Sequence, residues 1–208
     1  MRDQLIDGLQ RLNIEAGDTQ IDLLLAYVNL LVRWNQAYNL TAIRDPNDML
    51  RLHILDSLSV LWAMEGEDCL DVGTGGGLPG IPLAIFRPDI TFTLLDSNGK
   101  KTRFVTQAAI ELGLSNAKAV HSRIEEHTAT YSQVISRAFR DWERFAALCW
   151  SLVGDQGRLL AMLGQAPSLQ SVELSEHFPK NVYSAAIHSL QVPGIDAARH
   201  LMVLEKQT

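Results

Sequence analysis

A glycine-rich turn limits the folds and functions open to this chain more than any other feature. An apolar segment ends at Asp71-Val72, five glycines follow within eight residues, and a helix is predicted to begin near Pro79 or Ile81. Glycine lets the backbone turn sharply and come close to a ligand. In open α/β sheets, ligands bind at the carboxyl ends of the strands, where such a loop lies. We therefore predict that this loop lines a ligand pocket.

The chain around this turn, residues 67–208, alternates short apolar runs with helical stretches, which is typical of a doubly wound α/β sheet. Because no helix is predicted between the last two strands and Pro193-Gly194 favours a turn there, we expect these strands to form an antiparallel hairpin at one edge of a mostly parallel seven-stranded sheet. Strands are predicted near Cys69–Val72, Thr91–Asp96, Ala117–His121, Val134–Ser136, Arg158–Leu163, Val182–Leu190 and His200–Lys206. Helices are predicted near Ile81–Phe86, Gly99–Leu112 and Trp142–Val153.

Residues 1–66 carry helical patterns and no strand signal. Asp18 is a candidate cap for a helix that runs to about Tyr38, and Asp45-Pro46 favours a second start. Apolar residues at helical spacing from Met49 to Leu61 predict that this second helix is long. We therefore divide the chain into an N-terminal helical extension, 1–66, and an α/β domain, 67–208.

Two ligands compete for the glycine loop. Residues 75–80 match G-x-G-x-x-G, the dinucleotide pattern, but in that pattern the first glycine directly follows the strand, whereas here Asp71 and Gly73 come first. A pyrophosphate needs amide donors at a helix N-terminus. S-adenosylmethionine instead carries an ammonium group, which suits a nearby acid. We favour S-adenosylmethionine, with Gly75 and Gly77 in its pocket, over a dinucleotide or a turn without a ligand. Asp96 fits either ligand because it can accept hydrogen bonds from ribose hydroxyls.

The overall charge argues against a protein that binds nucleic acid over a broad surface. The net charge is −6 over 208 residues, whereas phosphate contacts usually require a basic protein. An RNA substrate would therefore need a local basic rim. Candidate members are Lys100, Lys101, Arg103, Arg123, Arg137, Arg140, Arg199 and His200.

The two cysteines, Cys69 and Cys149, lie in apolar runs and are predicted to be reduced, buried thiols. No secretory segment and no apolar run of membrane-spanning length is present in the sequence. We expect a cytoplasmic, monomeric protein without a bound metal ion.

Seven sequence segments together resemble the ribosomal small-subunit methyltransferase G family, also called glucose-inhibited division protein B. The similarity covers essentially the whole chain, which makes it far more specific than the glycine loop alone. The segments are WNQAYNLTAIRDP at 34–46, HILDSL at 53–58, DVGTGGGLPGIPLAI at 71–85, LLDSNGKKTRF at 94–104, SRIEE at 122–126, VISRAF at 134–139 and VPGIDAARHL at 192–201.

The resemblance implies a Rossmann-like fold and methyl transfer from S-adenosylmethionine to N7 of guanine 527, in the 530 loop of 16S rRNA. The rRNA would be recognised free or as part of the 30S subunit or an assembly intermediate. The positions that match the family's cofactor pocket are Gly73, Leu78, Ile124, Glu125 and Arg137.

Two positions depart from the family pattern. Leu52 stands directly before His53 where the family has arginine, and the arginine is one residue earlier, at Arg51. Leu163 stands where the family has lysine, which removes a cation expected near the RNA. Both departures concern the substrate contacts more than the cofactor pocket.

The end of the fourth strand bears on the methyl acceptor. Its Ser136-Arg137-Ala138-Phe139 lacks the proline pair of amino-group methyltransferases, and neither cysteine stands where a carbon-5 enzyme needs its nucleophile. Guanine N7 fits what remains. It has a free lone pair and no proton to remove, so no general base is needed.

Several other side chains allow more than one interpretation. Arg137 could position the cofactor or the base, or form a salt bridge at the strand end. His53 and Asp56 could cap the pocket or satisfy each other, and core packing is the first expectation for Trp34, Tyr38 and Phe139. The alternative functions are a methyltransferase acting on a small molecule, a nicotinamide-dependent oxidoreductase and a binding module without catalysis.

Overall fold

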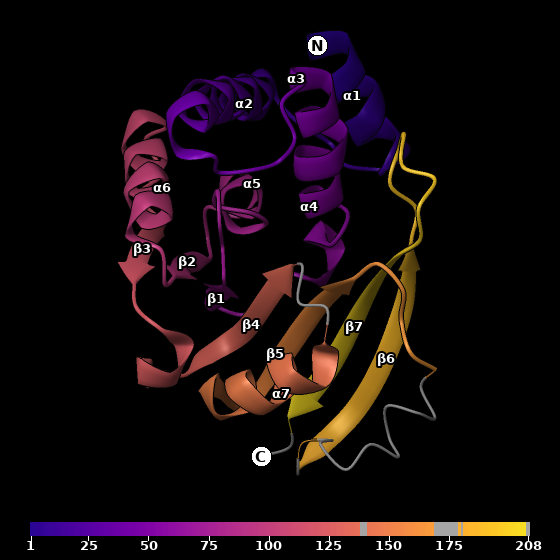
Figure 1. Cartoon of the computed structure of the whole chain (residues 1–208). Helices are drawn as coiled ribbons and strands as arrows, with labels where there is room; N and C mark the ends of the chain where they lie inside the picture. Colours follow the sequence, from indigo (N-terminus) through magenta and orange to yellow (C-terminus); the bar gives the residue numbers. More distant parts are fainter. Residues whose placement is uncertain (138–140, 169–178, 180, 207–208) are drawn as a thin grey trace.

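A seven-stranded sheet runs through the centre of the protein, here a computed structural model that describes residues 1–137, 141–168, 179 and 181–206 (Figure 1). The strand order is β3-β2-β1-β4-β5-β7-β6. The first five strands in this order, from β3 to β5, are parallel to one another, and β7 is antiparallel to both β5 and β6. The strands are β1 (Asp68–Val72), β2 (Thr91–Asp96), β3 (Ala117–His121), β4 (Tyr131–Arg137), β5 (Val153–Leu163), β6 (Val182–Leu190) and β7 (Arg199–Lys206). The predicted α/β sheet with an antiparallel edge pair is confirmed.

The helices cover the two faces of the sheet unequally (Figure 1). The N-terminal helices, α5 and α6 pack on one face, where Leu24, Ile54 and Phe104 belong to one apolar cluster. α7 packs on the other face, where Phe145 and Leu159 belong to a second cluster. The helices are α1 (Arg2–Arg11), α2 (Asp18–Tyr38), α3 (Pro46–Met49), α4 (Asp56–Leu58), α5 (Gly80–Phe86), α6 (Gly99–Glu111) and α7 (Trp142–Cys149), with short 3-10 turns η2 (Leu61–Ala63), η3 (Ile124–Glu126) and η4 (Trp150–Leu152).

The N-terminal helices begin nearly as the sequence predicts. Asp45 caps α3, because its side chain accepts hydrogen bonds from the backbone N–H groups of Asn47 and Asp48. The predicted cap Asp18 is instead the first residue of α2. Gly17 precedes it, and the Gln20 side chain accepts a hydrogen bond from the Gly17 N–H at 2.8 Å. The first turn of α2 is therefore capped by the side chain of Gln20, a residue of the helix itself, and not by Asp18.

The prediction of one continuous α-helix from Met49 to Leu61 is wrong. A π-helical segment, η1 (Leu50–Leu55), separates α3 from α4. The wider π turn changes which residues face the sheet, and both His53 and Asp56 are buried there. The proposed boundary near residue 66 falls between η2 and β1 and stays a prediction.

The predicted helix Trp142–Val153 is also shorter than expected. α7 ends at Cys149, the turn η4 follows, and Val153 already begins β5. The helix does not continue to Val153, because Val153 pairs with Tyr131 of β4 and is therefore held in the sheet. Both Cys69 and Cys149 are buried and free, as predicted. Within the described ranges, no helix has the length and apolar character needed to cross a membrane.

Candidate active site

A cavity of about 510 Å³ opens at the carboxyl ends of β1 and β2, within the size range of small-molecule sites. The strand order reverses between β1 and β4, and ligands of doubly wound sheets bind at such a switch point. Four of the predicted cofactor residues line this cavity: Gly73, Asp96, Ile124 and Glu125. Arg144 and Leu148 of α7 also line it.

The first support of the glycine loop is Asp71, which is fully buried. Its Oδ2 accepts hydrogen bonds from Thr74 Oγ1 at 2.6 Å and from the Gly80 N–H at 2.9 Å. No described residue donates to Oδ1. Burial raises the pKa of Asp71 to about 6. One half of the carboxylate therefore closes the loop, and the other half is left without a donor.

Asp96 gives the second support. Its Oδ2 accepts a hydrogen bond from the Gly75 N–H at 2.9 Å, and its Oδ1 accepts one from the Asn98 N–H at 2.8 Å. Lys101 Nζ lies 3.9 Å from Oδ2. Asp96 thus shapes the loop as well as lining the cavity. Lys101, predicted to face RNA, lines the same cavity.

The third support comes from α2 and was not predicted. The hydroxyl of Tyr27 donates a hydrogen bond to the Gly76 carbonyl, and Tyr27 is fully buried. In the sequence this tyrosine is one more large residue in a helix with an apolar face. Nothing local to position 27 indicates that it meets a loop 49 residues later.

The backbone at Gly73 leaves room for a ligand. Its φ is +69°, which favours glycine, and an added Cβ would meet no atom within 4 Å. Gly77 has a φ of +88°, but a Cβ there would lie 2.6 Å from Ile81. Gly73 is therefore open toward the cavity, whereas Gly77 is needed for packing. Leu78 is buried in the core cluster, and its N–H donates to the Thr74 carbonyl at 2.8 Å.

Arg137, at the end of β4, contacts the N-terminal helices. Its Nη1 donates hydrogen bonds to the Leu52 carbonyl at 3.0 Å and to Asp56 Oδ2 at 3.1 Å. Its Nη2 lies 3.5 Å from His53 Nδ1. His53 and Asp56, which were expected either to cap the pocket or to satisfy each other, thus both contact Arg137. Burial and the Arg137 charge lower the pKa of His53 to about 4, so this imidazole is neutral at pH 7.

The two departures from the family pattern have structural consequences. Arg51 donates a hydrogen bond to the Gly194 carbonyl at 2.8 Å and pairs with Asp48, so it holds the turn between β6 and β7. Leu163 is 6% exposed and belongs to the apolar cluster between α7 and the sheet, with Phe145 and Leu159. Leu163 is therefore strand core, and a lysine in its place would carry a charge into apolar surroundings.

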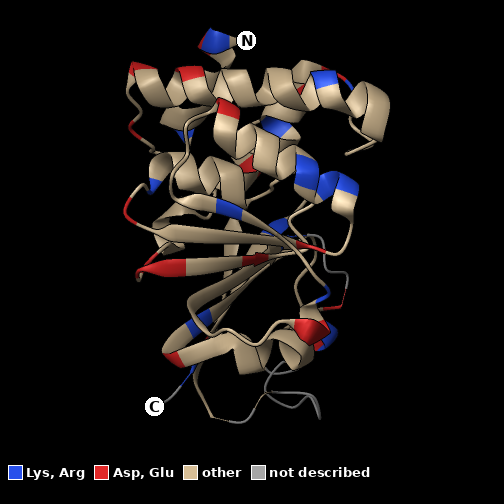
Figure 2. Cartoon of the chain, turned by 90° about the vertical axis from the view of Figure 1, so that its left-hand side faces the viewer, with Lys and Arg blue, Asp and Glu red and all other residues tan. Residues whose placement is uncertain are grey.

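The predicted basic rim is spread over several places. Lys100 and Arg103 are exposed near the start of α6, and Figure 2 shows positive residues gathered at that end of the helix, with charges of both signs elsewhere. Arg123 lines the cavity. Arg199 Nε donates to Asp56 Oδ1 at 2.9 Å, and His200 Nδ1 lies 2.9 Å from the Gly164 carbonyl.

Ala138, Phe139 and Arg140 lie outside the described residues. Trp34 packs against Tyr38 and Phe104.

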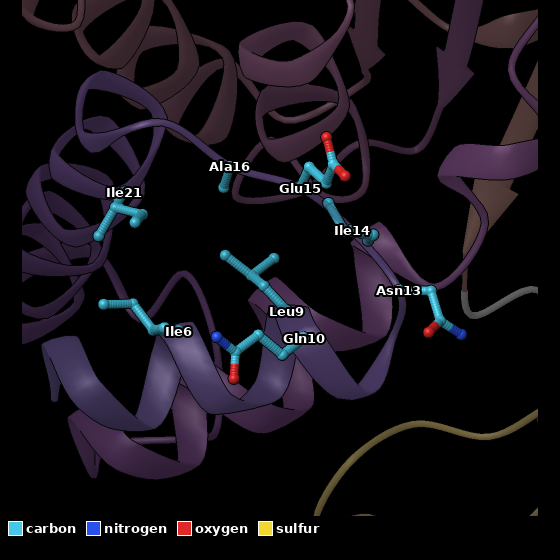
Figure 3. A pocket seen from close by; sticks show the side chains of 8 residues that line it. All are labelled: Ile6, Leu9, Gln10, Asn13, Ile14, Glu15, Ala16 and Ile21. Carbon is cyan, nitrogen blue, oxygen red and sulfur yellow. The ribbon is translucent and has the colours of Figure 1, made fainter.

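A second cavity, of about 490 Å³, lies between α1 and the segment leading into α2 (Figure 3). Ile6, Leu9 and Ile21 give it an apolar lining, and none of the predicted site residues contributes to it. No group of three or more His, Cys, Asp or Glu side chains suited to a metal ion occurs in the described part of the chain.

The comparison with protein families now decides between the candidate ligands. The model of the family described as rRNA small subunit methyltransferase G matches residues 20–202. This chain belongs to that family. Membership of a methyltransferase family implies use of S-adenosylmethionine and does not support the nicotinamide alternative. A relative from Stutzerimonas stutzeri named ribosomal RNA small subunit methyltransferase G is 47% identical, over 98% of this chain and 95% of its own length. A relative of the same name from Escherichia coli is 46% identical, over 99% and 98%.

Solved structures add a likeness of fold. A putative methyltransferase in complex with the Haloferax volcanii Trm112 activator has a TM-score of 0.60 at 14% identity, with 86% of this chain and 98% of that chain covered. An rRNA methylase from Streptococcus thermophilus has a TM-score of 0.51 at 15% identity, with 74% and 95% covered. The methyltransferase G family member therefore has the Rossmann-like methyltransferase fold that its sequence predicts.

Proposed function

We propose that this protein transfers the methyl group of S-adenosylmethionine to N7 of guanine 527 in the 530 loop of 16S rRNA. Membership of the methyltransferase G family, matched over residues 20–202, carries the proposal. Its partner is 16S rRNA, free or within the 30S subunit or an assembly intermediate, and its compartment is the cytoplasm.

The cavity suits the cofactor residue by residue. Gly73 leaves open space in front of its backbone, so the methionine part of the cofactor can lie against it. Asp96 would accept hydrogen bonds from the ribose hydroxyls, since each carboxylate oxygen can accept more than one. Ile124 and Glu125 would flank the adenine. The buried Oδ1 of Asp71, without a donor, suits the ammonium group.

The bound cofactor supplies an electrophilic methyl group on its sulfonium. The chain then has to orient the base and exclude water, because N7 already carries the attacking lone pair. No residue needs to remove a proton. The neutral His53, whose pKa is lowered to about 4, fits a site in which polar groups position rather than titrate. Arg137, at the end of β4 beside the switch point, would position cofactor or base.

The test is methyl transfer from labelled S-adenosylmethionine to 16S rRNA, and in parallel to 30S subunits, both from cells that lack the modification. We expect label at N7 of guanine 527 in at least one of the two substrates. The same RNA already carrying the methyl group is the control and should accept no label. Label at another nucleotide, or only in small molecules of an extract, would contradict the proposal. Calorimetry with the cofactor and with NAD separates binding from transfer.

A further inference from the structure

One buried carboxylate joins three elements that are far apart in the sequence. Asp56 of α4 accepts a hydrogen bond from Arg137 of β4 on Oδ2, at 3.1 Å, and one from Arg199 of β7 on Oδ1, at 2.9 Å. The Asp56 side chain is 7% exposed, and the two arginine side chains are 17% and 26% exposed. Both arginine side chains are therefore partly exposed to solvent, whereas the aspartate that joins them is buried.

The fold places this cluster on the ligand-binding edge of the sheet. Arg137 is the last residue of β4, and β1 and β4 flank the switch point. Arg199 begins β7, and since β7 is antiparallel to β5, its first residues meet the carboxyl end of β5, where His200 pairs with Leu163. The amino end of β7 and the carboxyl ends of β4 and β5 thus share one edge.

The two arginines differ in their surroundings beyond Asp56: Arg137 also donates to the Leu52 carbonyl and does not itself line the cavity. The positive charge of Arg137 reaches Asp71 under the glycine loop and lowers the pKa of that carboxyl, against the larger effect of burial. Arg199 uses Nε for Asp56 and Nη1 for the Ala198 carbonyl, and no described residue accepts a hydrogen bond from its Nη2. With His53 neutral, two guanidinium groups and one carboxylate leave a single positive charge, which suits a phosphate.

We propose that Asp56 is a positioning residue that fixes Arg137 at the end of β4, beside the strand that carries the glycine loop, and holds Arg199 toward a phosphate of the RNA. This inference rests on the proposed function, because it takes RNA as the substrate. The physical reason is that the two guanidinium groups repel each other without the carboxylate between them. Asp56 itself touches neither ligand.

The test uses the full-length variant Asp56→Asn, which keeps the size of the side chain and removes its charge. We expect weaker cofactor binding in calorimetry without RNA and a higher KM for 16S rRNA, each by about 10- to 100-fold, the loss expected when charge-assisted hydrogen bonds are removed. Glu65→Gln is the matched control. It breaks the ion pair with Arg158, which also ties the segment before β1 to the sheet but lies away from the cavity, and it should leave both ligands unaffected.

A double-mutant cycle separates positioning from a general loss of stability. If Asp56 acts on RNA through Arg199, Asp56→Asn should raise the KM for RNA no further in an Arg199→Ala background. Additive effects, unchanged ligand binding, or a loss confined to one of the two ligands would overturn the inference. Failure of the proposed function would look different, because the wild-type protein itself would then transfer no methyl group to 16S rRNA.

Discussion

At the scale of single residues, the buried charge of Asp71 lowers the stability of the folded chain, and the proposed function uses the same charge to bind the cofactor. The carboxyl group is fully buried, and its pKa is about 6 against an ordinary value of 3.8. Protonation therefore favours the folded chain. This contribution to stability is complete below pH 3.8 and is lost as the pH rises through 6. At neutral pH, holding the charged form buried costs roughly 3 kcal/mol, since one pH unit corresponds to about 1.4 kcal/mol.

We therefore predict that Asp71→Asn stabilises the protein without cofactor at pH 7.5, by up to about 3 kcal/mol, and weakens binding of S-adenosylmethionine. Asparagine keeps an acceptor for Thr74 and Gly80 and removes the buried charge. Urea unfolding of both proteins at pH 4.5 and 7.5 measures the first effect, and calorimetry measures the second. The stability difference should shrink at the lower pH. A variant that is less stable than the wild type at both pH values would contradict the assigned cost of burial.

At the scale of elements, α2 supports the glycine loop of the proposed cofactor site, although none of its residues is among those that line the cavity. Tyr27 holds the Gly76 carbonyl, and its ring packs against Phe104 of α6. Asp71 and Asp96 support the loop from the sheet side, and Tyr27 supports it from the helical extension. The loop that faces the ligand is thus fixed between two layers of the structure.

Tyr27→Phe should therefore raise the dissociation constant for S-adenosylmethionine by roughly 3- to 10-fold, because a buried carbonyl loses its donor. The ring and its packing are kept, so the KM for RNA should change little. Tyr38→Phe in the same helix, where the tyrosine is 39% exposed, controls for the loss of a hydroxyl. Equal cofactor affinity in all three proteins would show that the loop does not depend on α2.

At the scale of the whole molecule, an acidic chain has to bind a polyanion. The net charge is −6, and the described residues of the predicted basic rim lie at separate places: the start of α6, the cavity, and the ends of β4 and β7. Few phosphate contacts should then carry the binding, and the dependence on salt should be shallow for an RNA-binding protein.

Lys100→Ala should accordingly weaken RNA binding, leave cofactor affinity nearly intact, and lower the slope of log K against log salt by about 0.7–0.9. Lys118→Ala is a control with the same change in net charge, at an exposed position of β3. If the two variants bind RNA equally well, the start of α6 is not a phosphate contact, and overall charge alone governs the affinity.

Much of this architecture is local in origin, and the sequence predicts it well. Neighbouring residues alone specify several features: apolar runs of strand length, the helix start at Asp45-Pro46, and the glycines that directly follow an apolar strand. For this reason β2, β3, β6 and the start of α3 lie where the sequence pattern predicts them. The π turn at Leu50–Leu55 and the early end of α7 differ because packing against the sheet and pairing of Val153 with Tyr131 outweigh helical periodicity.

By itself, the sequence determined the fold class, the ligand loop and the family, because each depends on short segments whose spacing carries the chemistry. Only the tertiary structure decided which side chains work together. It brought Tyr27 to Gly76, joined Arg137 and Arg199 through Asp56, placed Lys101 in the lining of the cavity beside Gly73 and buried Leu163 in the core. These contacts link residues from 27 to 199 along the chain. No local pattern specifies them, since a buried partner is chosen by the packing of whole elements.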